Sequence, residues 1–299
     1  MHEQSAVAMM TKLKIAVYLL VAIAVLSLSI NFYQWTGNLG VYQENQDYAT
    51  RQQMASLLSQ IQMRANNALD KLNSSLLGAC QQLSTTGLDG TQARKVLSDL
   101  VASSSLIVNA ATADAHDVLL AVQPSNYSSI EGQDISAQEQ NIRMHQTMQP
   151  AMSNMIPLVE GFPGVVMVAP IFDANLKFMG SLSIVIQPYV MLQRTIASAI
   201  EGTGFSMWAM QTNATLIYDP DPAQQGKNLL TDPIYVDYPE VQAFTRQVAA
   251  QQAGYGTYQY YNLNLDNTAK VLVSKEAYWT TIGIYGAEWR LVITHIIDQ

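Results

Sequence analysis

Residues 202–235 read GTGFSMWAMQTNATLIYDPDPAQQGKNLLTDPIY. The segment predicts a short apolar strand at residues 205–210, a polar turn, and a second strand at residues 214–218. A loop punctuated by prolines follows and ends in the step Gly-Lys-Asn-Leu at residues 226–229. Because Gly, Pro, Asn and Asp mark turns and loops, the stretch indicates a β-hairpin that leads into a polar loop.

The same order of signals occurs earlier in the chain. Residues 108–113 and 118–122 predict two strands, and the step Gly-Gln-Asp-Ile follows at residues 132–135. The second halves of the two units also correspond, with strands expected at residues 165–172, 181–186, 271–277 and 289–296. Two copies of one supersecondary unit predict a tandem α+β fold with two antiparallel sheets.

Composition limits the classes of function. The chain has 299 residues, of which 13% are charged, and its formal net charge is −8. Nucleic-acid binding is excluded because it requires a clustered basic face, and the 15 Lys and Arg residues are dispersed. The single cysteine, Cys80, excludes an intrachain disulfide framework and a cysteine-based metal cage.

The amino-terminal region contains a long apolar run. Residues 13–33 are expected to form a transmembrane helix, because about 20 apolar residues suffice to cross a bilayer. Lys12 and Lys14 lie at its start, so residues 1–12 are expected to form a cytoplasmic stub. The rest of the chain is then extracytoplasmic, anchored to the cell membrane by a single pass. A cleaved signal peptide is the alternative, although no Ala-x-Ala site follows the run.

Residues 41–86 show apolar side chains at helical spacing. A helix of about 40 residues is about 60 Å long, which is more than one small lobe requires. It forms either a stalk packed along its own chain, which we favour, or a two-stranded coiled coil that joins a homodimer. Residues 88–188 then form a first lobe and residues 189–297 a second lobe.

At this point the chain resembles a known family. Each lobe carries the Gly-[Lys/Gln]-[Asn/Asp]-[Leu/Ile] step after its first hairpin, and the chain closes with Gly-Ala-Glu-Trp-Arg-Leu-Val at residues 286–292. This pattern resembles the double Cache (PAS-like) sensor regions of chemoreceptors and sensor histidine kinases. The resemblance implies a small-molecule site in the first, membrane-distal lobe. It also implies transmission through the long helix to a separate signalling partner.

The resemblance also directs attention to particular side chains. Relatives that bind amino acids carry an Arg-x-Trp-Tyr-like cluster, whereas residues 143–146 read Arg-Met-His-Gln, and residues 181–186 contain no acid. We therefore expect a carboxylate-like metabolite rather than an α-amino acid, with Arg143 as the forked donor. The expected ligand-binding residues of the first lobe are Tyr127, Gln138, Arg143, His145 and Asn154. The second lobe, with no cation in residues 229–238, is expected to bind nothing comparable.

No enzyme class fits the sequence. The four histidines show no metal-ligand spacing, so neither a metal nor a cofactor is expected. Asp219 and Asp221 resemble a carboxylate pair, but they lie in a proline-rich turn where Asp is favoured for backbone hydrogen bonding. Two hypotheses remain: a ligand-binding sensor module, and a structural or adhesive surface protein on the same scaffold. A first-lobe pocket of about 300 Å³ favours the former, whereas a filled first lobe with a large apolar patch favours the latter.

Overall fold

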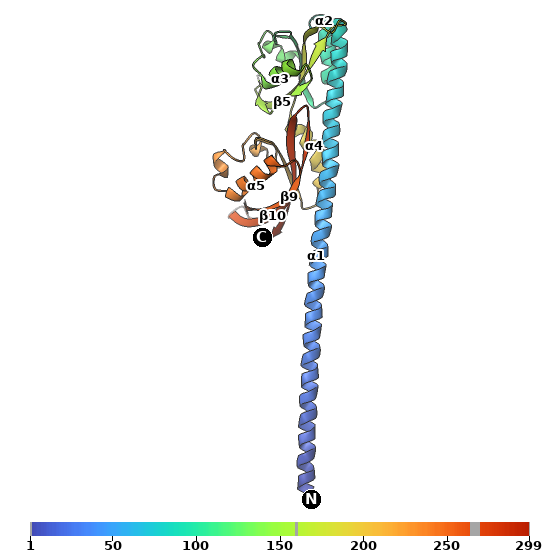
Figure 1. Ribbon diagram of the computed structural model, residues 1–299, viewed down its shortest axis with the longest axis vertical. Coiled ribbons are helices and arrows are strands. Elements are labelled where there is room, and N and C mark those ends of the chain that lie inside the picture. Colours follow the sequence, from blue (N-terminus) through green and yellow to red (C-terminus); the bar gives the residue numbers. More distant parts are fainter. Residues whose placement is uncertain (1, 159–160, 264–269, 299) are drawn as a thin grey trace. The chain divides into compact units, whose positions relative to one another are not determined.

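The computed structural model describes residues 2–158, 161–263 and 270–298 (Figure 1). Side chains are described at 26–29, 32–34, 44–158, 161–261 and 271–297. The chain divides into two compact units, Met1–Gln53 and Met54–Gln299, and the second unit contains both lobes. Residues 264–269, on which most of a polar turn expected at residues 262–267 falls, lie outside the described residues.

A single helix, α1 (His2–Thr86), precedes the lobes. From Met54 onward its buried side chains recur every three or four residues: Met54, Leu58, Ile61, Ala65, Leu69, Leu72, Leu76, Ala79 and Leu83. The predicted helical spacing is confirmed, except that Leu69 is buried where the sequence favoured Ala68. The helix ends where the Gly87 N–H donates to the Leu83 carbonyl at 2.9 Å, with Gly87 at φ +88°. This left-handed position favours glycine, which explains the stop.

Among the described residues, no helix combines the length and the apolar character needed to cross a bilayer. The span expected at residues 13–33 falls largely on side chains outside the described set.

The first lobe is a mixed α+β unit built on one antiparallel sheet. Its strands lie in the order β2-β1-β6-β5-β3, with β4 paired to β5. Its elements are α2 (Gly90–Ser103), β1 (Ile107–Asp114), β2 (Leu119–Gln123), η1 (Ser125–Ile130), α3 (Glu139–Thr147), β3 (Ala151–Met152), β4 (Ile156–Pro157), β5 (Pro163–Phe172) and β6 (Phe178–Ile186).

The second lobe has the same plan, with the strand order β8-β7-β11-β10-β9. Its elements are α4 (Pro188–Ile200), β7 (Ser206–Gln211), β8 (Leu216–Tyr218), η2 (Pro222–Gln224), η3 (Pro233–Tyr235), α5 (Pro239–Ala250), β9 (Gly254–Leu263), β10 (Lys270–Ile284) and β11 (Ala287–Asp298). In both sheets the first hairpin lies beside the last strand of the lobe. The prediction of two antiparallel sheets with one repeated topology is confirmed.

The two glycine steps occupy equivalent places. The Gly132 N–H donates to the Leu119 carbonyl at 2.8 Å, and the Gly226 N–H donates to the Leu216 carbonyl at 2.8 Å. Both glycines have positive φ, +84° and +81°. Each step therefore returns the chain to the second strand of its hairpin in the same way, which confirms the internal repeat read from the sequence.

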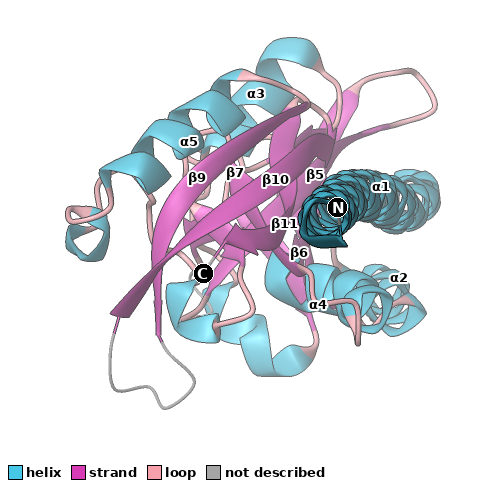
Figure 2. Cartoon of the chain, turned by 90° about the horizontal axis from the view of Figure 1, so that it is seen from below, coloured by secondary structure: helices cyan, strands magenta, loops and turns pink. Residues whose placement is uncertain are grey.

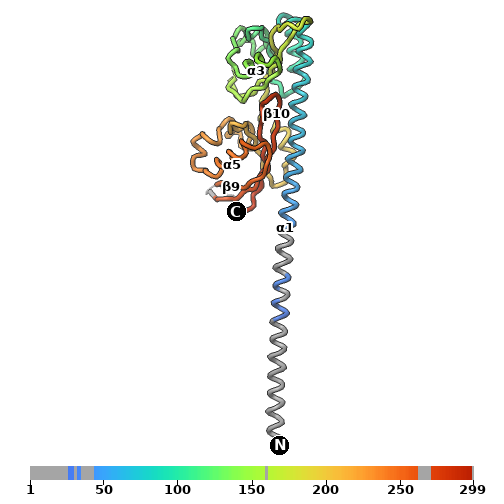
Figure 3. The backbone as a smooth tube through the Cα atoms, viewed as in Figure 1, coloured from blue at the N-terminus to red at the C-terminus, as the bar shows by residue number. Residues whose placement is uncertain are grey.

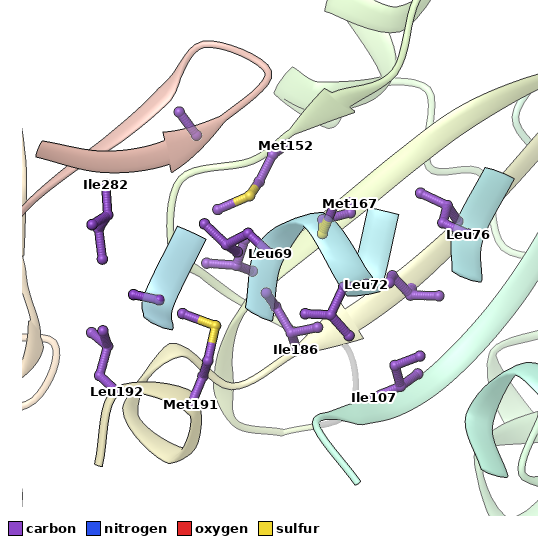
Figure 4. Packing of buried hydrophobic residues seen from close by; sticks show 14 of the residues in the cluster. Leu69, Leu72, Leu76, Ile107, Met152, Met167, Ile186, Met191, Leu192 and Ile282 are labelled. Carbon is purple, nitrogen blue, oxygen red and sulfur yellow. The ribbon is translucent and has the colours of Figure 1, made fainter. Parts of the chain in front are cut away.

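The main core lies where α1 meets both sheets. Figure 4 shows Leu69 and Leu72 of α1 close to Met167 and Ile186 of the first sheet, and Ile282 of the second sheet belongs to the same cluster. Figure 2 shows α2 and α4 on this side of the sheets, whereas α3 and α5 lie on the other. One face of each sheet is thus committed to the core, and only the α3 and α5 faces remain to form a site.

Candidate functional site

Arg143, the expected carboxylate donor, lies at the junction of the two lobes. Its Nη2 donates to the Met152 carbonyl, and its Nε lies 3.8 Å from Glu139 Oε1. A Cβ atom built on Gly286, in the β10–β11 turn of the second lobe, would lie 3.8 Å from Arg143 Nη1. The guanidinium is thus held by first-lobe groups, beside the β10–β11 turn of the second lobe.

Asn154 also bridges the lobes. Its Oδ1 accepts a hydrogen bond from Gln211 Nε2 at 3.0 Å, and its Nδ2 donates to Glu139 Oε2 at 3.3 Å. Gln211 is the last residue of β7 and is almost fully buried. Asn154 therefore ties α3 to the first hairpin of the second lobe.

The other three expected residues lie apart from one another. His145 Nε2 lies 2.8 Å from Asp117 Oδ2, and Tyr127 packs on a small cluster that includes Ile130. Only Gln138 lines the first-lobe cavity, which encloses just about 30 Å³. The structure does not bring the five residues together around one cavity. A separate hollow of about 430 Å³ lies between α1 and the end of α2, where Lys71 and Ser104 line it, and none of the five residues contributes to it.

A cavity in the second lobe lies between its sheet and the segment that follows β8. It encloses about 380 Å³. Its walls are formed by Ser206, Trp208, Leu216, Asp219, Pro220, Asp221, Gln224, Leu229, Ile234, Tyr235, Tyr238, Val241, Phe244, Tyr258, Tyr260, Lys275 and Thr294. This volume lies within the range of about 300–1,000 Å³ that is typical of small-molecule sites.

Strand alternation explains why these side chains meet. Side chains two residues apart in a strand point to the same face of a sheet, so Tyr258 and Tyr260 of β9 share a face. Lys275 shares that face because it is directly paired with Tyr258 in the β9–β10 register. Ser206 and Trp208 come from β7 in the same way.

Aromatic rings make up much of the wall. The Phe244 and Tyr258 rings stack at 4.5 Å between centroids, and the Tyr238 and Tyr260 rings stack at 5.5 Å. Trp208 meets Phe244 edge to face at 6.4 Å. Rings in such contacts are rigid and mutually supported, so they hold the cavity open instead of collapsing into it.

Two opposite charges lie in this aromatic setting. Burial raises the pKa of the Asp219 carboxyl above its usual value, an effect that the hydrogen bond from the Asp221 N–H partly offsets. Burial lowers the pKa of the Lys275 ammonium, an effect that attraction to Asp219 partly offsets. Lys275 Nζ lies 4.7 Å from the centroid of the Tyr260 ring, a cation–π contact.

Sequence reasoning missed this site although its residues were visible. The sequence drew attention to Asp219 and Asp221, but Lys275 lies far beyond residues 229–238, in which no cation occurs, and only the sheet register brings it to the cavity. The available signal was the alternation of Tyr258 and Tyr260 along one strand, followed by Lys275 in the next strand. Among the described residues, no three His, Cys, Asp or Glu side chains gather to hold a metal ion.

Comparisons with known proteins agree with the fold. Residues 67–188 match the family model described as HK/GC/Chemotaxis protein-like, sensor domain. An extracellular ligand binding receptor from Desulfohalobium retbaense is 34% identical, with a TM-score of 0.69 over 81% of this chain. The chain has the double Cache fold of chemoreceptor sensor domains.

The chain covers only 40% of the Desulfohalobium receptor chain. More distant structures share the fold. The ligand-binding domain of the Pseudomonas fluorescens chemoreceptor CtaA, in complex with L-serine, is 12% identical with a TM-score of 0.59, over 86% of this chain and all of that one. The ligand-binding domain of the Pseudomonas aeruginosa chemoreceptor PctC, in complex with GABA, is 14% identical with a TM-score of 0.58, over 80% of this chain and 97% of that one. No curated protein sequence matches the chain.

Proposed function

We propose that this chain is the extracytoplasmic ligand-binding part of a membrane sensor and that its ligand occupies the second-lobe cavity. The observation that carries the proposal is a cavity of about 380 Å³ with aromatic walls and a few charged groups, whereas the first-lobe cavity that Gln138 lines encloses about 30 Å³. Small-molecule sites have this mostly apolar lining with few orienting polar groups. A purely structural or adhesive role gives no reason to keep such a cavity open.

The ligand carries a carboxylate, and Lys275 binds it. A buried ammonium without a matched anion is costly, so an incoming carboxylate relieves that cost by forming a charge-assisted hydrogen bond. The structural neighbours from Pseudomonas hold L-serine and GABA, both of which carry a carboxylate. Lys275 thus takes over the role that the sequence assigned to Arg143.

Transmission runs from the cavity to α1. Strand β10 carries Lys275 and, further along, meets the helix directly: Gln62 Nε2 donates to the Thr281 carbonyl at 2.9 Å. The Gly283 N–H donates to Asn66 Oδ1 at 3.3 Å. In this proposal residues 13–33 anchor the chain in the membrane and residues 1–12 lie in the cytoplasm. A ligand-induced shift of β10 would then move α1 and pass the signal through this helix to a partner protein.

The test is a thermal-shift screen of the full-length protein in detergent against small carboxylates, followed by calorimetry of each hit. A ligand that binds only the folded state stabilises it by RT ln(1 + c/Kd), where c is the free ligand concentration, so the melting temperature rises with the ligand concentration. Losing a hydrogen bond to a charged group costs about 1.5–3 kcal/mol, so Lys275→Met should weaken binding about ten- to a hundredfold.

The matched control is Arg143→Met, which removes the cation that the sequence favoured. We expect Arg143→Met to keep the wild-type affinity. An unchanged affinity in Lys275→Met with a large loss in Arg143→Met would place the ligand in the first lobe and overturn the proposal.

A further inference from the structure

The second-lobe cavity holds a carboxylate, Asp219, and an ammonium, Lys275, that do not form an ion pair with each other. Among the described side chains, no salt bridge joins Asp219 to Lys275. Both are partly buried and both line the same cavity. Each buried charge costs free energy unless an opposite charge meets it. A ligand that carries only an anion would neutralise Lys275 and leave Asp219 uncompensated.

The surroundings of Asp219 are aromatic. Tyr235, Tyr258 and Tyr260 line the same cavity as Asp219. Burial raises the pKa values of their hydroxyls, and the Asp219 carboxylate contributes to the rise. The same cavity already holds one cation over a ring face, because Lys275 Nζ lies over Tyr260. This end of the cavity thus combines a carboxylate with ring faces, which together attract an organic cation.

Hydrogen-bond acceptors at this end are partly engaged within the protein. Asp219 Oδ1 accepts from the Asp221 N–H at 2.9 Å, and Gln224 Oε1 accepts from the Tyr235 hydroxyl at 2.8 Å. A primary ammonium brings three donors that all need acceptors once they are buried. An N-methylated nitrogen brings few or none, and its methyl groups pack against rings.

We infer that the cavity binds a small N-methylated zwitterion, a betaine, with its carboxylate on Lys275 and its cationic nitrogen between Asp219 and the tyrosine rings. The inference rests on the proposed function, because it names the ligand class of that same cavity. It assigns Asp219 and the rings as the groups that select the cation, whereas Lys275 selects the carboxylate.

The experiment is a methylation series measured by calorimetry on the full-length protein: glycine, N-methylglycine, N,N-dimethylglycine and glycine betaine. The carboxylate is constant across the series and only the number of methyl groups changes. We expect the affinity to rise along the series and to differ at least tenfold between its ends. Choline, which keeps the quaternary nitrogen and lacks the carboxylate, should bind more weakly than glycine betaine.

Two kinds of variant assign the two ends of the ligand. Tyr260→Leu and Tyr235→Leu each remove a ring and should reduce the rise in affinity along the methylation series. Two ring variants are used so that the test survives if one of them fails to fold. Lys275→Met should abolish the advantage of glycine betaine over choline. Tyr255→Leu is the matched control, because Tyr255 lies on β9 but outside the cavity lining and is 41% exposed; it should leave the series unchanged.

The outcomes separate this inference from the proposed function. Glycine binding as tightly as glycine betaine, or no binding by any member of the series, overturns the betaine assignment. If another carboxylate from the screen binds and its affinity depends on Lys275, the proposed function stands without the betaine assignment. A methylation series that persists in both ring variants likewise contradicts the inference.

Discussion

The two lobes share a topology but differ in what their sheets carry on the open face. In each sheet the central pairing is the same: Ser183 of β6 lies between Ala111 and Val168, and Val292 of β11 lies between Trp208 and Trp279. Ala111 therefore corresponds to Trp208, and Val168 corresponds to Trp279. Small side chains in the first lobe stand where the second lobe has large rings.

By the same comparison, Gly164 of β5 is equivalent to Lys275 of β10. Gly164 lies four residues before Val168, and Lys275 lies four residues before Trp279. A Cβ on Gly164 would lie 2.5 Å from Leu158 Cδ1. Leu158 thus fills in the first lobe the space that an ammonium-bearing chain occupies in the second. One duplicated scaffold has become a filled lobe and a hollow one through a few side chains at equivalent positions.

The largest expected effect concerns the ring that supports the hollow lobe. Trp279 is 2% exposed, packs edge to face on Phe244 and donates its indole N–H to the Gln251 carbonyl at 3.1 Å. Trp279→Ala should lower the free energy of unfolding by about 3–5 kcal/mol, the usual cost of removing a buried Trp. Urea unfolding monitored by circular dichroism measures it.

The counterpart, Val168→Ala in the first lobe, removes two methyl groups and should cost about 1–2 kcal/mol at about 0.8 kcal/mol per buried carbon. Equal losses at the two positions would contradict the view that rings support the second lobe more than small residues support the first.

The sequence was sufficient for the fold because strand signals, turn glycines and the repeat are local. Gly132 and Gly226 could be matched from the sequence because each follows the first hairpin of its lobe at a position that requires positive φ. The proposed second-lobe site could not be located in this way. Arg143 and Asn154 have ligand-like side chains, but the lobe boundary engages them, and nothing local to residues 143–154 shows this. Lys275 and Asp219 line the same cavity only because the β9–β10 register and the loop after β8 bring them there.

A smaller effect is expected from the carboxylate of the hollow lobe. Asp219 has a raised pKa in the folded state, so the native protein holds this proton more tightly than the unfolded chain. The resulting penalty is absent below the unfolded pKa of about 3.9 and grows to its full size as pH rises past the folded pKa. Asp219→Asn should therefore be more stable than wild type at pH 7 while binding its ligand more weakly.

Urea unfolding at pH 7 and near pH 3.5 measures the difference, which should shrink at the lower pH. A variant less stable than wild type at pH 7 would show that Asp219 stabilises the fold instead of serving the site.

The smallest effect concerns an ion pair that the filled lobe has and the hollow lobe lacks. Arg94 Nη1 lies 2.6 Å from Glu131 Oε1, and the position equivalent to Glu131, directly before the glycine step, holds Gln225 in the second lobe. The hydrogen bond from Arg94 lowers the pKa of Glu131. The pair therefore stabilises the fold above the unfolded pKa of about 4.3, and this contribution is lost as pH falls through the lowered folded pKa.

Glu131→Gln copies the second lobe at this position. Because both partners are partly exposed, the loss at pH 7 should stay below about 1 kcal/mol and should fade toward acidic pH. Thermal melts of both proteins at several pH values check this, and a loss that persists unchanged in acid would mean that packing, not charge, is responsible.

The account depends most on the location of the ligand, which a crystal structure of the protein with its tightest small carboxylate shows directly. We predict ligand density in the second lobe, with the carboxylate at hydrogen-bonding distance from Lys275 Nζ and the rest of the molecule among the tyrosine rings near Asp219. Density in the first lobe beneath α3, with Leu158 displaced from Gly164 and an empty second lobe, would contradict it.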